Sequence, residues 1–336
     1  MPPNHLPPAV VGLSESQALA SAVARQAGIA VLPLEERAFD GGEFKLRPLE
    51  SVRGRQLFVV QSLAATAEEP APARLVRLMF LLQGLRDGGA DSRMVVMPYF
   101  AFARKDRRTQ LRDPVTARYV AELLEAAGAD GLIGLDVHNP AAFDNAFRIP
   151  TVHMSALPML VEHFLRRLDA RTPITVVSPD VGGIKRAQIF RELLSARCGR
   201  EIGLAFVEKR RARGIVASGA LAGERAAHSA VELDDLCATG GTLIRAASAC
   251  REGGAAAVHV AVTHTPLDAG LAALIAAEPI DSITTTDSVG FALPAAHAPG
   301  ATDRLVTLPV APLFAAALRR MLAGEPVAPL LEHWPG

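Results

Sequence analysis

The stretch ELDDLCATGGTLIRAA, residues 232–247, joins the elements that decide the fold. An apolar run of strand length ends in two adjacent carboxylates, Asp234 and Asp235, and a glycine-containing turn leads into a segment of helical spacing that begins near Leu243. A strand, a tight turn and a helix in this order indicate an α/β unit. Ligands of open α/β sheets bind outside the carboxyl ends of the strands, so this turn is a candidate binding site.

The turn has the composition of a phosphate site. Free backbone N–H groups and the positive end of the helix dipole favour an anion at the start of a helix, and glycine lets the backbone approach it closely. The residues that offer these groups, together with two hydroxyl donors, are Thr239, Gly240, Gly241 and Thr242. Ionised carboxylates only accept hydrogen bonds, so Asp234 and Asp235 suit sugar hydroxyls or a hydrated magnesium ion. The stretch therefore predicts a pocket for a phosphorylated sugar, and it matches neither of the nucleotide motifs GxxxxGK[ST] and GxGxxG.

The rest of the chain alternates short aliphatic runs with longer segments of helical period. Runs that do not alternate with polar residues indicate strands covered on both faces, and they lie at 56–62, 93–100, 131–138, 174–180, 202–208, 230–235 and 257–264. Segments between them, such as 73–90 and 114–129, finish in Gly-Ala, as helices often do. We therefore predict an α/β protein with mainly parallel sheets. His228, Ser229 and Glu232 interrupt one apolar run, for which we expect an exposed or altered strand.

The composition excludes several classes of protein. The chain has 336 residues, and its 35 basic residues balance its 35 acidic ones, so no overall field attracts nucleic acid or a membrane surface. Its length favours two domains. Three cysteines without CxxC spacing argue against a disulfide framework or a structural zinc site and fit a reducing cytoplasm. Neither a targeting pattern nor an apolar stretch of membrane-spanning length is present in the sequence, so we expect a cytoplasmic protein.

Several segments in register resemble the ribose-phosphate pyrophosphokinase family. LDDLCATGGTL is similar to the phosphoribosyl-diphosphate loop that this family shares with phosphoribosyltransferases. Other segments are similar to blocks of the kinases alone, and they include FDGGEFKLRPLESVRGRQLFVVQS, MPYFAFARKDRR, DPVTARYVAELLEAAGAD, LDVHNPA, VVSPDVGGIKRAQ and VEKRR. The resemblance implies two tandem phosphoribosyltransferase-type domains, residues 1–155 and 156–305, each a mainly parallel sheet flanked by helices. It also implies that the helices of 306–336 pack on the first domain.

The resemblance implies transfer of diphosphate from ATP to the anomeric hydroxyl of ribose 5-phosphate, with Mg²⁺ as the cofactor. The products of this reaction are phosphoribosyl diphosphate and AMP. The family's sugar-phosphate positions match Asp234, Asp235, Thr239, Gly240, Gly241 and Thr242, and its ATP positions match Phe39, Glu43, Arg104, Lys105 and Arg107. In the family, the segment of Phe39 and Glu43 reaches the ATP site of a neighbouring subunit. We therefore expect a homo-oligomer built from dimers, up to a hexamer.

Four further residues take their expected roles from the same resemblance. His138 and Asp180 match the positions associated with magnesium. Lys209 and Arg211 match a loop that closes over the reacting phosphates, where positive charge would stabilise the transition state.

Two departures from the family pattern leave alternatives open. Ala238 stands where the kinases usually carry an aspartate, and Gly41 stands where their N-terminal block has one. Alanine cannot accept a hydrogen bond from a sugar hydroxyl. We therefore favour an active, divergent pyrophosphokinase and keep two alternatives, a weak or inactive paralogue that regulates an active kinase, and a phosphoribosyltransferase-like enzyme for another sugar phosphate. The ATP-type blocks count against the last of these.

Overall fold

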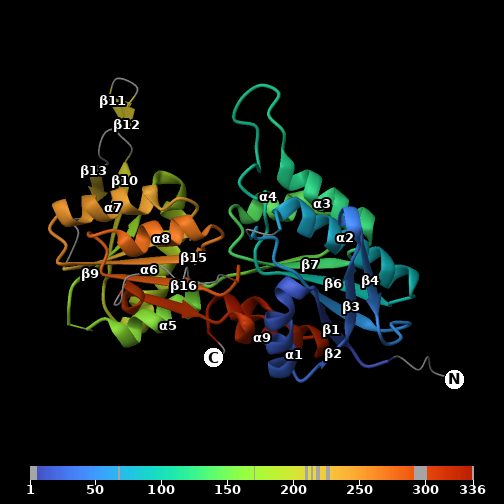
Figure 1. The fold of residues 1–336 in the computed structure, drawn as a ribbon. Helices are drawn as coiled ribbons and strands as arrows, with labels where there is room; N and C mark the ends of the chain where they lie inside the picture. The colour runs from blue at the N-terminus through green and yellow to red at the C-terminus, as the bar shows by residue number, and fades with distance from the viewer. Residues whose placement is uncertain are drawn as a thin grey trace.

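The computed structural model describes residues 6–66, 69–169, 171–208, 211–212, 215–216, 220–224, 228–290 and 301–334. They form two α/β lobes, each built on its own sheet (Figure 1). Within these residues, no helix is both long enough and apolar enough to span a membrane. The predicted α/β architecture with mainly parallel sheets is confirmed.

The first lobe contains a six-stranded sheet in the order β2-β1-β5-β6-β7-β8, in which every pairing is parallel. Its strands are β1 (Ala9–Gly12), β2 (Ala30–Val31), β5 (Gln56–Val60), β6 (Ser92–Met97), β7 (Gly131–Leu135) and β8 (Thr151–Met154). Its helices are η1 (Ser14–Ser16), α1 (Gln17–Ala27), α2 (Ala71–Asp87), α3 (Thr116–Ala127) and α4 (Pro140–Ala146). Along β1, Val10 joins the core beneath α1, and Ala9 and Val11 join the core beneath α2 and α3. Burial of both faces explains why the strand sequences are continuously apolar.

The second lobe contains a seven-stranded sheet in the order β13-β10-β9-β14-β15-β16-β17, parallel except for the β10–β13 pair. Its strands are β9 (Ile174–Ser178), β10 (Gly203–Glu208), β13 (Ala220–Gly223), β14 (Ser229–Leu236), β15 (Ala257–His264), β16 (Ser282–Thr286) and β17 (Leu305–Leu308). Its helices are α5 (Leu157–Arg167), η3 (Val181–Gly183), α6 (Ile184–Cys198), α7 (Gly241–Glu252), α8 (Asp268–Ala276) and η4 (Ala301–Arg304). The side chains of α5 and α6 pack on one face of the sheet, and those of α7 and α8 pack on the other.

The expectation of an exposed strand at 230–235 is wrong. β14 lies between β9 and β15 and pairs with both of them. The side chain of Glu232 is fully buried, and one of its oxygens lies 3.7 Å from the thiol of Cys250 on α7. Pairing on both sides satisfies the backbone of the strand, and burial raises the pKa of the Glu232 carboxyl well above its usual value, so this side chain is buried in its neutral form.

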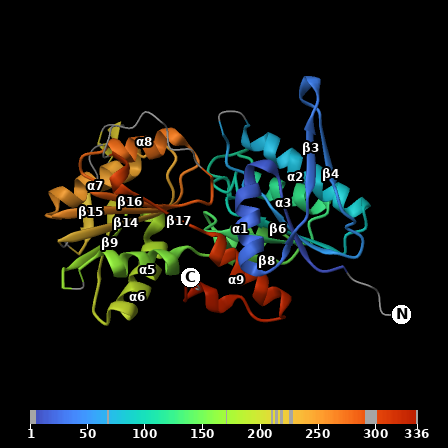
Figure 2. The same cartoon turned by 60° about the horizontal axis from the view of Figure 1, so that its bottom comes forward.

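The last helix returns to the first lobe. α9 (Ala311–Leu322) lies beside α1 in both views (Figures 1 and 2), and Arg319 Nη1 donates to the carbonyl oxygen of Gln26 at 2.6 Å. η5 (Ala328–Leu331) follows it. Leu313 and Phe314 of α9 belong to the same buried cluster as Val23 of α1 and Phe164 of α5, so one core spans both lobes. The boundaries at 155 and 305 remain predictions.

A hairpin extends from the first lobe. It consists of β3 (Leu34–Ala38) and β4 (Phe44–Pro48), joined by η2 (Asp40–Gly42), and it stands out beyond the helices in Figure 2. Gly41 and Gly42 have φ values of 84° and 88°, which glycine adopts without strain, so they permit the tight turn at the tip. A second small pair, β11 (Arg211–Ala212) and β12 (Ile215–Val216), lies at the edge of the second lobe.

Candidate active site

The carboxyl ends of strands from both lobes meet around a cavity of about 160 Å³. The first lobe lines it with residues that follow β6 and β7, and the second lobe lines it with residues at the ends of β14 and β15. The polar side chains of the lining are Tyr99, Arg104, Lys105, Thr116, Asp136, His138, Asp235 and His264. The structure thus brings together predicted site residues from three separate sequence blocks, namely Arg104, Lys105, His138 and Asp235.

Asp235 makes the principal polar contacts of this cavity. Arg186 Nη1, from the first turn of α6, lies 2.7 Å from Asp235 Oδ1 and 3.6 Å from Asp234 Oδ1. His138 Nδ1 lies 2.9 Å from Asp235 Oδ2, and the backbone N–H of Asp235 donates to Asp234 Oδ1 at 2.9 Å. Asp235 therefore joins a cation of its own lobe to a histidine of the other lobe.

The two neighbouring carboxyls have opposite pKa shifts. Burial, and then the negative charge of Asp235, raise the pKa of Asp234 to about 8. Burial also opposes ionisation of Asp235, but the contacts with His138 and Arg186 outweigh it and hold the pKa of that carboxyl well below its usual range. The same contact with Asp235 raises the pKa of His138. At neutral pH the pair shares one proton, and the contacts of Asp235 with His138 and Arg186 favour its position on Asp234.

The predicted phosphate loop is a close-packed turn at the start of α7. Gly240 precedes the helix with φ 78°, and a Cβ there would lie 3.1 Å from the carbonyl oxygen of Gly270. A Cβ on Gly270 would in turn lie 2.3 Å from the carbonyl oxygen of Ala238, so the turn rests directly on the start of α8. The first N–H groups of an α-helix have no partner within the helix, which leaves those after Gly240 for an anion. Arg245 Nη2 donates to Thr242 Oγ1 at 3.3 Å and adds a cation beside the turn.

Asp180 caps the helical turn that follows β9. Its Oδ1 accepts from the backbone N–H groups of Gly182 and Gly183 at 2.9 and 3.2 Å. A Cβ on Gly183 would lie 2.7 Å from Ser178 Oγ, so glycine is required for this close approach. Among the described residues, no group of three or more His, Cys, Asp or Glu side chains forms a metal cage. A magnesium ion that keeps its waters and takes phosphate oxygens needs only one or two protein ligands, and the carboxylate of Asp180 suits that role by donor type.

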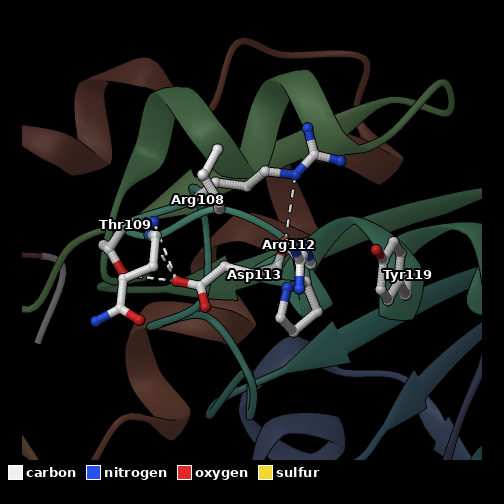
Figure 3. Close-up of a pocket in the computed structure, with 8 residues that line it drawn as sticks. Arg108, Thr109, Arg112, Asp113 and Tyr119 are labelled. Atoms are coloured by element: carbon white, nitrogen blue, oxygen red, sulfur yellow. Dashed lines mark hydrogen bonds between the residues drawn. The ribbon is translucent and has the colours of Figure 1, made fainter.

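The basic segment after β6 is folded around Asp113. Asp113 Oδ2 accepts from Thr109 N, Thr109 Oγ1 and Gln110 N at 3.1, 2.7 and 3.1 Å (Figure 3). It also lies 3.0 Å from Lys105 Nζ. These hydrogen bonds hold the pKa of Asp113 well below its usual range. Arg104 and Lys105 line the cavity, and Arg107 is exposed on the same loop. The loop therefore presents cations to the cavity from a defined conformation.

The other predicted site residues lie away from the cavity or cannot be placed. Phe39 and Glu43 flank the tip of the hairpin, both are exposed, and neither lines the cavity. The guanidinium of Arg37 stacks over the ring of Phe39 at 5.0 Å. Lys209 lies outside the described residues, and for Arg211 only the backbone, in β11, is described.

The sequence did not predict the roles of two parts of this site. Arg186 follows the SPDVGG segment closely, and its position in the first turn of a helix is a signal that could have been used. Asp136 has φ 37°, an uncommon conformation for a residue with a side chain, and it accepts from Thr263 Oγ1 at 2.6 Å across the lobes. His264 Nε2 lies 3.0 Å from the carbonyl oxygen of Leu135, so a second polar contact joins the lobes at the same place.

Comparisons with known proteins agree along most of the chain. Residues 9–128 match the N-terminal domain of ribose phosphate pyrophosphokinase, and residues 155–296 match the phosphoribosyl transferase domain. The ribose-phosphate pyrophosphokinase of Caldanaerobacter subterraneus is 34% identical over 313 residues, which are 93% of this chain and 94% of that protein. The enzyme of the same name from Bacillus caldolyticus is 34% identical over 95% of this chain and 96% of its own length.

A solved structure gives the same result. The phosphoribosylpyrophosphate synthetase of Mycobacterium smegmatis superimposes with a TM-score of 0.81 at 28% identity, covering 95% of this chain and 99% of that one. Both domain matches, the relatives and the shared fold lead to one conclusion: this chain belongs to the ribose-phosphate pyrophosphokinase family of enzymes.

Proposed function

We propose that this protein transfers the diphosphoryl group of ATP to the anomeric hydroxyl of ribose 5-phosphate, giving phosphoribosyl diphosphate and AMP. The main support is the position of Asp235, at the head of the phosphate loop, in the same cavity as Arg104 and Lys105 of the other lobe. A sugar phosphate on one lobe and a nucleotide on the other would therefore face each other. Membership of the family supports the same reaction.

In this proposal the second lobe holds the pentose. The 5-phosphate would bind the N–H groups at the start of α7 and the hydroxyls of Thr239 and Thr242, and the sugar hydroxyls would donate to Asp234 and Asp235. Arg186 and His138 already contact Asp235, but a carboxylate has about four lone-pair sites, so both contacts are compatible with a bound sugar. Arg186 keeps Asp235 ionised and ready to accept these hydrogen bonds.

The first lobe would hold ATP through Arg104, Lys105 and Arg107, whose cations suit phosphate oxygens. The anomeric oxygen would bond to the β-phosphorus while the bond breaks between that phosphorus and the oxygen that joins it to the α-phosphorus. AMP would leave with the bridging oxygen, and the hydroxyl proton would be released. Such a transfer needs positioning and charge neutralisation more than covalent help, and Lys209 and Arg211 are proposed to add positive charge as the transition state forms.

Magnesium is the proposed cofactor, with Asp180 and His138 as its protein ligands. When bound, it would neutralise charge on the phosphates. Asp180 fits because a carboxylate oxygen is a ligand that magnesium prefers. The contact of His138 with Asp235 raises the pKa of the imidazole and so favours its protonated form, which cannot bind a metal.

The position of the hairpin supports the proposed oligomer. Phe39 is 41% exposed at the tip, and neither it nor Glu43 reaches the cavity of its own chain. An ATP contact from these residues therefore requires a second copy, as in a dimer-based assembly up to a hexamer. The free cysteines, two of them buried, and the proposed use of ATP fit a cytoplasmic enzyme.

The decisive experiment measures AMP and phosphoribosyl diphosphate together. Purified protein with Mg²⁺, ATP and ribose 5-phosphate should release the two products in equal amounts, and other pentose phosphates should give less. Ala238→Asp restores the acid that the family usually carries and should raise turnover if its absence limits the rate. Binding of both substrates without any AMP would refute the proposal and favour the non-catalytic, regulatory reading that Ala238 and Gly41 suggest. Formation of a base–sugar product from phosphoribosyl diphosphate would favour a phosphoribosyltransferase instead.

A further inference from the structure

The hairpin has two chemically different faces. Residues opposite each other in an antiparallel pair share a face, and successive residues alternate between faces. The outer face carries charges that pair within the hairpin, since Glu35 lies 3.2 Å from Lys45 Nζ and 2.5 Å from Arg47 Nε. The inner face is made of Leu34, Glu36, Ala38, Phe44, Leu46 and Pro48. Among these paired residues, all of them described, Glu36 is the only charged residue on the inner face.

The apolar residues of the inner face pack on the first lobe. The ring of Phe44 meets that of Phe80 on α2 edge to face, with centroids 5.2 Å apart. Leu34 and Leu46 pack against the core beneath α2 and α3. Contacts of this kind resist separation, but they have little directional preference, so a hairpin held by them alone could pivot on α2.

The charged residue of this face, Glu36, pairs with one guanidinium and also accepts a hydrogen bond from Ser14 Oγ at 3.3 Å. Arg77, on α2, forms a salt bridge with Glu36 through Nη2, and its Nη1 lies 3.0 Å from both Glu15 and Glu69. Nη2 also donates to Ser14 Oγ at 3.3 Å. The contacts join α2 to three other places in the first lobe: η1 after β1, strand β3, and the segment before α2. The side chains of Arg77 and Glu36 are only 16% and 18% exposed, so solvent screens the pair weakly.

We propose that Arg77 is a positioning residue that fixes the angle at which the hairpin leaves the first lobe and so places Phe39 and Glu43 for the ATP site of a neighbouring copy. The inference rests on the proposed function, because it assumes that the hairpin tip contacts ATP. A planar guanidinium that donates to carboxylates from several elements is directional in a way that the contact between Phe44 and Phe80 is not. A charge placed on an otherwise apolar face specifies one docked arrangement, as buried polar groups do in the best-attested cases.

Glu36→Ala is the cleanest test, with Glu35→Ala as its matched control. Arg77 itself is less suitable, because its removal would leave three carboxylates facing one another. Glu36→Ala removes both contacts of the hairpin carboxylate, to Arg77 and to Ser14 Oγ, and leaves Arg77 paired with Glu15 and Glu69. Glu35→Ala makes the same change one residue earlier in the same strand, and it breaks only pairs within the hairpin.

Two measurements follow on the full-length protein with Mg²⁺. In the kinetic assay, Glu36→Ala should raise the KM for ATP about fivefold, which corresponds to part of the free energy of one charge-assisted hydrogen bond. The KM for ribose 5-phosphate should stay within about twofold of its original value. Glu35→Ala should change both by less than about twofold. In hydrogen exchange followed by mass spectrometry, residues 32–49 should exchange faster in Glu36→Ala than in Glu35→Ala.

The outcomes separate this inference from the proposed function. If both variants behave alike in kinetics and in exchange, or if Glu36→Ala raises both KM values equally, Arg77 does not position the hairpin for ATP. If the unaltered protein makes no AMP, the proposed reaction fails, and the exchange experiment alone decides whether Arg77 fixes the hairpin. In that case, equal exchange in the two variants overturns the positioning role of Arg77, and faster exchange in Glu36→Ala supports it.

Discussion

Arg186→Met tests whether a buried counter-ion holds the acid pair together. The substitution removes the guanidinium and retains an unbranched apolar side chain. The Arg186 side chain is 16% exposed and that of Asp235 is 6% exposed, so the ion pair is mostly removed from water. Loss of one partner from a buried pair typically costs ~3–5 kcal/mol. Because His138 still contacts Asp235, we expect the lower end of that range, ~3 kcal/mol of the free energy of unfolding.

The assay is urea unfolding followed by circular dichroism, on the unaltered protein, Arg186→Met, Asp235→Asn and the double variant. Asp235→Asn removes the charge that Arg186→Met leaves uncompensated, so the double variant should recover ~2 kcal/mol relative to the sum of the single changes. If the two lobes unfold in separate transitions, the loss of stability in Arg186→Met should appear in the transition of the second lobe.

Acid should reduce the difference between Arg186→Met and the unaltered protein. The pKa of Asp235 is lowered in the folded protein, so its contribution to stability is present above the unfolded pKa and is lost as the pH falls through the folded value. Arg186→Met lacks much of that contribution at any pH, so the two curves should converge. A cost below ~1 kcal/mol near neutral pH, or a double variant no more stable than additivity predicts, would refute the role of Arg186 as counter-ion.

Three further predictions concern the pH dependence of sugar-phosphate binding, the packing of the phosphate loop, and Lys209. Burial and the charge of Asp235 raise the pKa of Asp234 to about 8, and only the ionised form accepts two sugar hydroxyls well, so affinity for ribose 5-phosphate should rise with pH and level off above about 8. Gly270→Ala would place a Cβ 2.3 Å from the Ala238 carbonyl oxygen, so it should lower the free energy of unfolding by ~1–3 kcal/mol and weaken sugar-phosphate binding. Gly84→Ala, whose Cβ would have nothing within 4 Å, should raise the free energy of unfolding by ~0.5–1 kcal/mol. Lys209→Ala should lower kcat by at least about tenfold with little change in the KM for ATP.

Each of these has a clear contrary result. In calorimetry across the pH range, the affinity of Asp234→Asn for ribose 5-phosphate should not rise with pH in this way. A rise that persists in this variant would assign the titration to another group. Equal stability of Gly270→Ala and the unaltered protein would mean that the turn is not packed on α8 as described. A parallel rise in the KM for ATP with Lys209→Ala would indicate a static anchor for the nucleotide.

The sequence predicted what depends on local pattern. Runs such as 131–138 and 257–264 are continuously apolar because helices cover both faces of each sheet, and the structure places strands there. The helix near Leu243 begins at Gly241, where the glycine turn ends. The acid pair and the glycine turn at the end of one strand indicated the edge of the sheet at which the cavity lies, since ligands of open α/β sheets bind at the carboxyl ends of the strands.

The sequence could not predict what depends on distant partners. Glu232 is fully buried, and burial raises its pKa well above the usual value, although its polar character indicated exposure. The neighbours of β14, which are β9 and β15, decide its position, and they lie elsewhere in the chain. Arg186 gains its meaning only when α6 brings it to Asp235, and the same holds for Arg77 and the hairpin. Whether Phe39 and Glu43 contact ATP depends on a second copy of the chain.

The return of α9 to α1 has a consequence for how the protein is made. Phe314 and Leu313 complete an apolar cluster that includes Val23 of the first lobe, and they are synthesised after every strand of both sheets. Until then, the amino-terminal half presents uncovered apolar surface, which promotes aggregation during synthesis. A stop codon at Ala311, which removes α9 and everything after it, should therefore yield insoluble polypeptide, even though every strand of both sheets would still be encoded.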